Sequence, residues 1–316
     1  MIHSKTETVF QVRDLSKHYA ELKAVDAISF DVFKGEIFGF LGPNGAGKTT
    51  TINMICGLLP PTHGQIKFSV SADRDQKAKT RIGICPQENI FWPKLTCLEQ
   101  LLFSGQMYGR RVKAIKQRAH SLLETMGLSE KSKVLAKNLS GGMKRRLNIC
   151  LALIHDPSVL ILDEPEAGLD PQSRILVRDF IKGLAKEKTI ILTTHNMDEA
   201  DRLSDRVAII DKGQLLLVDT PRKLKRSIGE GDLLEIVLGQ ADLTKLQAVV
   251  DQFTQQFNRV TYHDSVLLIN SRNLIESVAD ISSILTSAGA VIQSMTMREN
   301  TLEDVFIHLT GNKLRE

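Results

Sequence analysis

The sequence predicts an α/β domain built on a mixed sheet, followed by a smaller α+β domain. Two apolar runs, residues 159–162 and 189–192, are typical of strands buried on both faces of a parallel sheet. A Gly-rich loop at residues 42–49 follows a short apolar strand and precedes a segment with helical spacing. The pattern changes near residues 225–231, and 316 residues are too many for one ordinary domain.

The first domain alternates strands and helices after an antiparallel start. Alternating or continuous apolar residues predict strands at 9–12, 28–33, 36–41, 81–85, 159–162, 189–194, 206–210 and 214–218. Helical spacing predicts helices at 49–58, within 95–128 and at 144–154.

The second domain has a different order of elements. Strands are predicted at 233–238, 259–262, 266–270 and 291–297, and helices at 243–257, 274–288 and 302–309. The first six elements follow the βαββαβ order of a ferredoxin-like domain. No residue cluster in this part of the sequence indicates chemistry.

Composition limits the classes of function. The chain is 42% hydrophobic and 25% charged with a net charge of +4, which fits a soluble globular protein and gives no reason to expect nucleic acid. Its four cysteines have no CxxC spacing, so neither a zinc site nor a disulfide framework is predicted, and a reducing cytoplasm suits them. The N-terminus lacks the apolar core of a signal peptide, and no apolar run approaches the ~18–20 residues that span a bilayer. Any action on a membrane would therefore need a partner.

The loop at residues 42–49 has the pattern G-x4-G-K-T of a phosphate-binding loop, between a strand and a helix as that motif requires. Its glycines let backbone N–H groups surround phosphates at a helix N-terminus. Lys48 is expected to reach the β- and γ-phosphates, and the Thr49 hydroxyl to bind Mg²⁺.

An acidic pair, Asp163 and Glu164, ends the apolar run at 159–162. Strand ends of such sheets face the ligand crevice. Asp163 suits Mg²⁺, directly or through water, and Glu164 suits positioning or deprotonating an attacking water. A solvated strand end is the alternative.

With the remaining motifs in order, the chain resembles the nucleotide-binding subunit of an ATP-binding-cassette (ABC) transporter over roughly residues 8–220. The motifs are the signature Leu139-Ser140-Gly141-Gly142-Met143, the Q-loop Gln87, the switch His195, the D-loop Gly168-Leu169-Asp170 and the adenine-side Tyr19. For Tyr19 plain packing is the alternative, and for Asp170 a helix-capping role alone.

The resemblance implies a fold and a domain division. The fold is a P-loop NTPase cassette over residues 8–225, with a mixed sheet core, an antiparallel β subdomain and a helical subdomain at about 88–158. Residues 231–316 would form the ferredoxin-like accessory or regulatory domain.

The resemblance also implies site residues and a Mg²⁺-dependent ATPase. ATP would bind Tyr19, Gly42, Pro43, Asn44, Gly45, Ala46, Gly47, Lys48, Thr49 and Thr50. A partner copy would close the site with Ser140, Gly141, Gly142 and Asp170, because the family pairs its subunits head to tail. The metal would be held by Thr49, Gln87 and Asp163, and catalysis would use Glu164, His195 and Gln87.

Two residues depart from the family pattern. Met143 replaces the usual signature glutamine, and Glu166 stands where the family usually has Thr. The run from Ser140 to Arg146 is similar to exporters that include daunorubicin-resistance and sodium-extrusion ATPases. An added carboxylate at position 166 should be unfavourable near a polyphosphate unless it points away.

The tail Glu303-Asp304-Val305-Phe306 resembles the same exporter branch. It would stabilise or regulate the dimer, or its apolar positions would simply pack. Phe91 and Trp92 follow the Q-loop and would contact the membrane subunit, or belong to the core of the helical subdomain.

We therefore expect a cytoplasmic ATPase, a homodimer or a pair with a similar ATPase, held at the cytoplasmic face of the membrane by a separate integral permease that it powers for export. One alternative is a soluble ABC-type ATPase in DNA repair or translation. Another is a non-catalytic binding module that keeps the cassette as a dimer scaffold.

Overall fold

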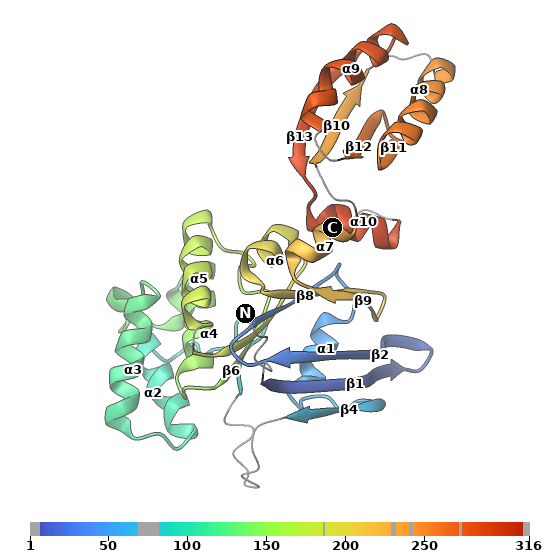
Figure 1. Ribbon diagram of the computed structural model, residues 1–316. Helices are drawn as coiled ribbons and strands as arrows, with labels where there is room; N and C mark the ends of the chain where they lie inside the picture. Colours follow the sequence, from blue (N-terminus) through green and yellow to red (C-terminus); the bar gives the residue numbers. More distant parts are fainter. Residues whose placement is uncertain are drawn as a thin grey trace. The chain divides into compact units, whose positions relative to one another are not determined.

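The computed structural model describes residues 7–68, 82–185, 187–228, 232–239, 243–271 and 274–311. The described residues divide into two compact units, one within residues 7–220 and the other within 221–311 (Figure 1). Residue 81 of a predicted strand, the predicted domain start at 231 and residues 312–316 lie outside the described residues.

A six-stranded mixed sheet forms the centre of the first unit. Its order is β5-β6-β7-β3-β8-β9, parallel except for the antiparallel pair β8/β9. The strands are β3 (Ile37–Leu41), β5 (Ile82–Cys85), β6 (Val159–Asp163), β7 (Thr189–Thr194), β8 (Arg206–Asp211) and β9 (Gln214–Asp219). Every residue of β3, β6 and β7 is buried, as predicted for strands covered on both faces.

The carboxyl ends of the central strands meet at one edge of this sheet. Asp163 at the end of β6 pairs with Thr193 of β7, and Thr194 pairs with Leu41 at the end of β3. The loops that follow these strands therefore converge, which is the place where open α/β sheets bind ligands.

A three-stranded antiparallel sheet, in the order β2-β1-β4, makes up the rest of the first unit's strands. It consists of β1 (Thr8–Tyr19), β2 (Leu22–Phe33) and β4 (His63–Phe68). The first two strands are longer than the sequence predicts. β4 was not predicted, because Ile66 is its only residue that is even partly buried and the strand shows no apolar alternation. Phe30, Phe38 and Phe40, with ring centroids 5.1–5.4 Å apart, join this sheet to the central one.

Helices and short 3₁₀ turns complete the first unit. They are α1 (Lys48–Ile55), α2 (Cys97–Met107), α3 (Val112–Thr125), η2 (Ser129–Lys131), η3 (Ala136–Asn138), α4 (Gly141–Leu153), α5 (Pro171–Leu184) and α6 (Met197–Leu203). The helical stretch predicted within 95–128 is two helices, because Gly109 adopts φ 70° between α2 and α3. α2 begins at a capping box between Thr96 and Glu99. Among the described residues, no helix is both long and apolar enough to cross a membrane.

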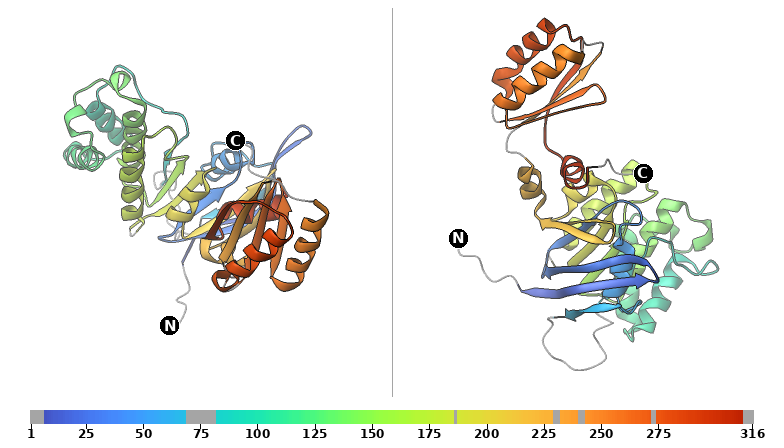
Figure 2. Two further views of the ribbon diagram at one scale, coloured as in Figure 1. Left: turned by 90° about the horizontal axis from the view of Figure 1, so that it is seen from above. Right: turned by 90° about the vertical axis from the view of Figure 1, so that its right-hand side faces the viewer.

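The second unit has the predicted βαββαβ order. It comprises α7 (Pro221–Ser227), β10 (Asp232–Leu238), α8 (Leu243–Gln256), β11 (Arg259–His263), β12 (Val266–Ser271), α9 (Leu274–Ser287), β13 (Ile292–Glu299) and α10 (Leu302–Thr310). The antiparallel sheet has the order β11-β12-β10-β13, with α8 and α9 packed on one face (Figure 2). In the tail, Val305 and Phe306 are buried, so packing accounts for these two apolar positions.

Candidate functional site

The Gly-rich loop, residues 42–49, connects β3 to α1, and its residues 44–49 border a cavity of about 640 Å³ that Gly42 and Pro43 do not line. The cavity is also lined by Tyr19, Gln87 and Glu164. Gly47 has φ 100°, and a Cβ there would lie 2.5 Å from the Ala24 carbonyl oxygen, so a side chain does not fit. Gly47 is the N-cap of α1, and it lines the cavity together with the first residues of that helix.

Lys48 is a buried cation at the base of the loop. Its Nζ donates to the carbonyl oxygens of Gly42 at 2.8 Å and Pro43 at 3.0 Å. Burial lowers the pKa of Lys48, while the charges of Glu164 and Asp163 oppose that change. The carboxylates at the end of β6 therefore only partly offset the effect of burial on the pKa of Lys48.

The acidic pair at the end of β6 is held by threonines. Thr49 Oγ1 donates to Asp163 Oδ2 at 3.1 Å, and Thr193 Oγ1 donates to Asp163 Oδ1. The Glu164 backbone N–H donates to the Oγ1 and the carbonyl oxygen of Thr193, each at 3.1 Å. Glu164 has φ 52°, a conformation that costs a non-glycine residue of order 1–3 kcal/mol and is often found at active sites.

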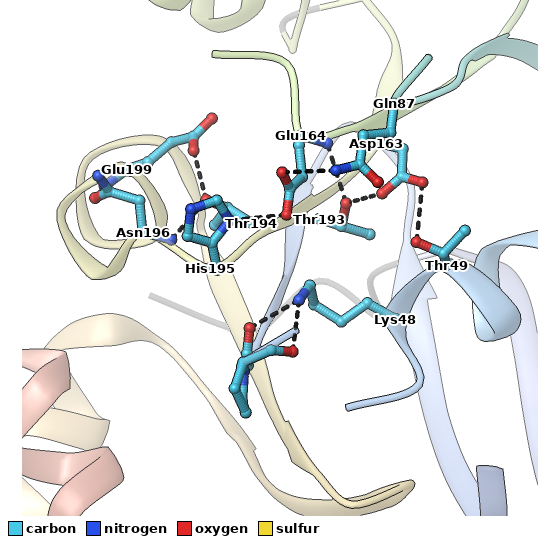
Figure 3. A network of polar contacts seen from close by, with 12 residues as sticks. Lys48, Thr49, Gln87, Asp163, Glu164, Thr193, Thr194, His195, Asn196 and Glu199 are labelled. Atoms are coloured by element: carbon cyan, nitrogen blue, oxygen red, sulfur yellow. Dashed lines mark hydrogen bonds and ion pairs between the residues drawn. The ribbon is translucent and has the colours of Figure 1, made fainter. Parts of the chain in front are cut away.

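The three predicted catalytic residues lie together (Figure 3). Glu164 Oε1 is 2.8 Å from His195 Nδ1, and Gln87 Nε2 donates to Glu164 Oε2 at 3.3 Å. The carboxylate is 9% exposed, whereas the His195 side chain is 52% exposed. One carboxylate is thus fixed from two sides, by loops that follow β5 and β7.

Comparison with known proteins agrees with this geometry. A family model described as ABC transporter matches residues 25–167. The linearmycin resistance ATP-binding protein of Bacillus subtilis is 40% identical over 98% of this chain and 100% of its own length. The chain belongs to the ABC transporter ATP-binding subunits. Nod factor export ATP-binding protein I of Ralstonia nicotianae is 37% identical over 98% of this chain and 95% of its own.

Solved structures show the same cassette fold. The ATP-binding subunit of an ABC transporter has a TM-score of 0.64 at 28% identity, covering 70% of this chain and 93% of that chain. CbiO1 of Clostridium perfringens, part of the ABC transporter complex CbiONQ, has a TM-score of 0.61 at 28% identity, covering 69% and 90%. The expected cassette fold and the membership of the ABC family are therefore confirmed.

As an ABC ATP-binding subunit, the chain binds ATP and belongs among ATPases. The two full-length relatives are named for resistance and export, so they support the exporter branch. They give no support to the alternative of a soluble ATPase in DNA repair or translation.

The signature residues of this ABC subunit lie apart from its own cavity lining. Ser140 is the N-cap of α4 and accepts from the Met143 N–H at 3.3 Å. Ser140 and Gly141 are exposed, and neither they nor Gly142 and Asp170 line the cavity beside the Gly-rich loop. Asp170 caps α5 by accepting from the Ser173 N–H at 3.0 Å. Asp170 therefore does have a helix-capping role.

Tyr19 ends β1, and its side chain is half-exposed. Its ring lies 5.3 Å from the Lys17 Nζ and lines the cavity, a placement that differs from a packed core position. Phe91 packs against the core of the unit, as one alternative predicts. Trp92 is 43% exposed and packs edge-on against Phe103.

Glu166 is not among the described residues that line the cavity beside the Gly-rich loop. It is buried and accepts from Arg178 through both oxygens, at 3.1 and 3.0 Å. Glu166 also raises the pKa of Arg178 through that hydrogen bond. The carboxylate expected to disturb the site is therefore neutralised in place.

Two residues at this site were missed by the sequence reasoning. Thr193 contacts both Asp163 and the Glu164 backbone, and its place opposite Asp163 on the next strand was the available signal. Glu199 is buried, its Oε2 accepts from the Thr194 hydroxyl, and burial raises its pKa to about 7. Glu199 lies in the first turn of α6, where acidic residues are common, and the sequence spacing there does not distinguish a buried glutamate from an exposed one.

Proposed function

We propose that this ABC subunit is a Mg²⁺-dependent ATPase that powers export through a separate membrane permease. The carrying observation is the carboxylate of Glu164, held by Gln87 and His195 beside the phosphate-binding Lys48. A carboxylate fixed at the end of a strand is suited to positioning and deprotonating a water.

The residues present fit a magnesium ion. Thr49 Oγ1 and Asp163 Oδ2 are 3.1 Å apart, so two hard oxygen ligands already lie side by side. Gln87 uses its amide nitrogen toward Glu164, which leaves its amide oxygen for the metal. When bound, Mg²⁺ would neutralise charge on the phosphate oxygens.

His195 is arranged to act on the terminal phosphate. Its Nδ1 faces the Glu164 carboxylate, which accepts a hydrogen bond, so in the imidazolium form, where both ring nitrogens donate, Nε2 would donate to a phosphate oxygen. Lys48 and the backbone N–H groups of the loop bind the β- and γ-phosphates, and Tyr19 stacks on the adenine.

The site is completed by a second copy or by a similar ATPase. Ser140, Gly141, Gly142 and Asp170 of the partner would meet the nucleotide. Support comes from the exposed N-terminus of α4, a site for anions that lies apart from its own cavity lining. ATP would then hold the two subunits together, and its hydrolysis would separate them.

The names of the relatives support a role in export. Proteins named for linearmycin resistance and Nod factor export match nearly the whole chain. We infer a subunit on the cytoplasmic face of the membrane, bound to an integral permease, with the second unit in an accessory or regulatory role.

The test is Glu164→Gln. We expect the ATPase rate to fall by about 10²-fold or more, several kcal/mol at ~1.4 kcal/mol per decade, while an ATP-dependent dimer accumulates. The matched control is Glu187→Gln, the same chemical change at an exposed glutamate. Hydrolysis by Glu164→Gln at the parental rate would show that Glu164 has another role.

A further inference from the structure

Arg145 is a buried cation on α4, five residues after Ser140. Only 2% of its surface is exposed to solvent. It donates to five backbone carbonyl oxygens, those of Pro86, Gln87, Asp163, Glu164 and Pro165. A guanidinium has five N–H donors, so this set of acceptors can use all of them.

The five carbonyls belong to two separate loops. Pro86 and Gln87 follow β5, whereas Asp163 ends β6 and is followed by Glu164. The two strands are parallel neighbours, with Cys85 opposite Leu162, so their ends lie at the same level. Arg145 therefore joins the loop of Gln87 to the turn of Glu164 from a third element, α4.

No acidic side chain pairs with Arg145 within the part of the chain that the structure describes. The Nη2–Glu164 O distance is 2.9 Å, the Nη1–Gln87 O distance is 3.2 Å and the Nε–Pro165 O distance is 3.4 Å. A buried charge is tolerated only when polar groups compensate for lost water, and here carbonyl dipoles do so. This arrangement depends on the two loops keeping their positions.

We propose that Arg145 is a positioning residue that couples the signature motif, residues 139–143, to the Glu164 carboxylate of the same subunit. The inference rests on the proposed function, in which the partner's nucleotide contacts Ser140. α4 rises about 1.5 Å per residue, so Ser140 and Arg145 lie on one short rigid element. A displacement of that element by the partner's nucleotide moves the carbonyls of Gln87 and Glu164 together.

A merely structural role predicts something different. If Arg145 only filled the core, its replacement would lower stability and leave the chemistry of folded molecules unchanged. A coupling role predicts a lower turnover number with intact nucleotide binding, because the loop of residues 42–49 does not contact Arg145 in any described hydrogen bond.

The test compares Arg145→Lys with Arg146→Lys. Lysine has three donors on one nitrogen and cannot span carbonyls on two loops. Arg146 donates instead to the Met126 carbonyl oxygen at 2.7 Å. Its replacement is therefore a control, because it makes the same chemical change at a neighbouring arginine that does not hydrogen-bond to the loops of Gln87 and Glu164. We expect Arg145→Lys to reduce kcat by about 10²-fold, as for other small misplacements. The Kd for ATP should stay within about threefold, and Arg146→Lys should keep both values.

Amide hydrogen exchange supplies the second readout. In the parental chain, adding ATP should change exchange in residues 140–146, 86–89 and 163–166 together. In Arg145→Lys the last two segments should no longer follow the first. If the parent binds ATP without hydrolysing it, the proposed function fails, and the exchange data still decide the role of Arg145.

Folding is checked by the thermal midpoint. If Arg145→Lys unfolds, Arg145→Gln, which removes the buried charge and keeps an amide donor, is measured in its place. Parental kcat and parental coupled exchange in a folded Arg145 variant would overturn the inference.

Discussion

The ion pair of Glu166 and Arg178 offers a sharp test of the electrostatics beside the site. Arg178→Met removes the cation and leaves the Glu166 carboxylate buried without its partner. The two side chains are 8% and 19% exposed, and both carboxylate oxygens are used. Other carboxylates lie near Glu166. Burial raises the pKa of Glu199, and the charges of Glu166 and Glu164 raise it further.

The magnitude follows from the burial. Removing one partner of a buried ion pair destabilises a protein by about 3–5 kcal/mol, because the remaining charge is uncompensated. Arg178 retains some contact with water, so we place the expected loss near the lower limit, about 3 kcal/mol. That loss corresponds to a change of about 100-fold in the folded-to-unfolded ratio.

The assay is urea unfolding followed by tryptophan fluorescence. Trp92 is the single tryptophan of the chain, and it lies in the same unit as the ion pair. A loss of about 3 kcal/mol should lower the midpoint by at least about 1 M, since m is ~1–3 kcal/mol per M.

A double variant provides the control. Glu166→Leu combined with Arg178→Met replaces the ion pair by apolar side chains, a change that is often neutral or stabilising. We expect the double variant to recover most of the lost stability. A single Arg178→Met variant as stable as the parent, or a double variant no better than the single one, would refute the reasoning.

Two further predictions concern neighbouring residues. Burial raises the pKa of Glu199 from 4.5 to about 7, so its contribution to stability is complete below pH 4.5 and is lost as pH rises through 7. Glu199→Gln should therefore gain about 3 kcal/mol relative to the parent between pH 4.5 and pH 8 in urea titrations, and parallel pH curves would contradict this. Gly47→Ala should abolish ATP binding in a calorimetric titration, because its Cβ would clash with Ala24 O, whereas Gly183→Ala in α5 meets nothing within 4 Å and should bind normally. Normal ATP binding by Gly47→Ala would show that the loop can adjust.

The parts of the fold that were predictable are those whose burial is uniform or strictly periodic. β6 and β7 are buried at every residue, and the α/β order of the second unit follows clear apolar patterns. β4 escaped prediction because an exposed edge strand carries no such pattern. The break between α2 and α3 depends on the positive φ of Gly109. The apolar spacing of residues 95–128, taken as a whole, is helical and does not show this break.

The candidate site divides in the same way. Sequence motifs predict residues that would contact a common ligand, such as Lys48 and Glu164, because binding that ligand requires certain residue types at a fixed spacing. Among the described residues, the hydrogen bonds of Arg145 go to backbone carbonyls, and a backbone carbonyl is the same whatever the residue type, so no sequence motif marks it. The pairing of Glu166 with Arg178 could not be predicted either, because Arg178 lies twelve residues further along the chain, on α5.

The central claim is that this subunit hydrolyses ATP to drive a separate permease. The most direct measurement is affinity purification of the tagged chain from its native cells in mild detergent, with identification of the co-purifying proteins and an ATPase assay of the complex. We predict recovery of a polytopic membrane protein whose presence changes the ATPase rate. Recovery of only soluble partners, ribosomes or DNA would contradict the claim.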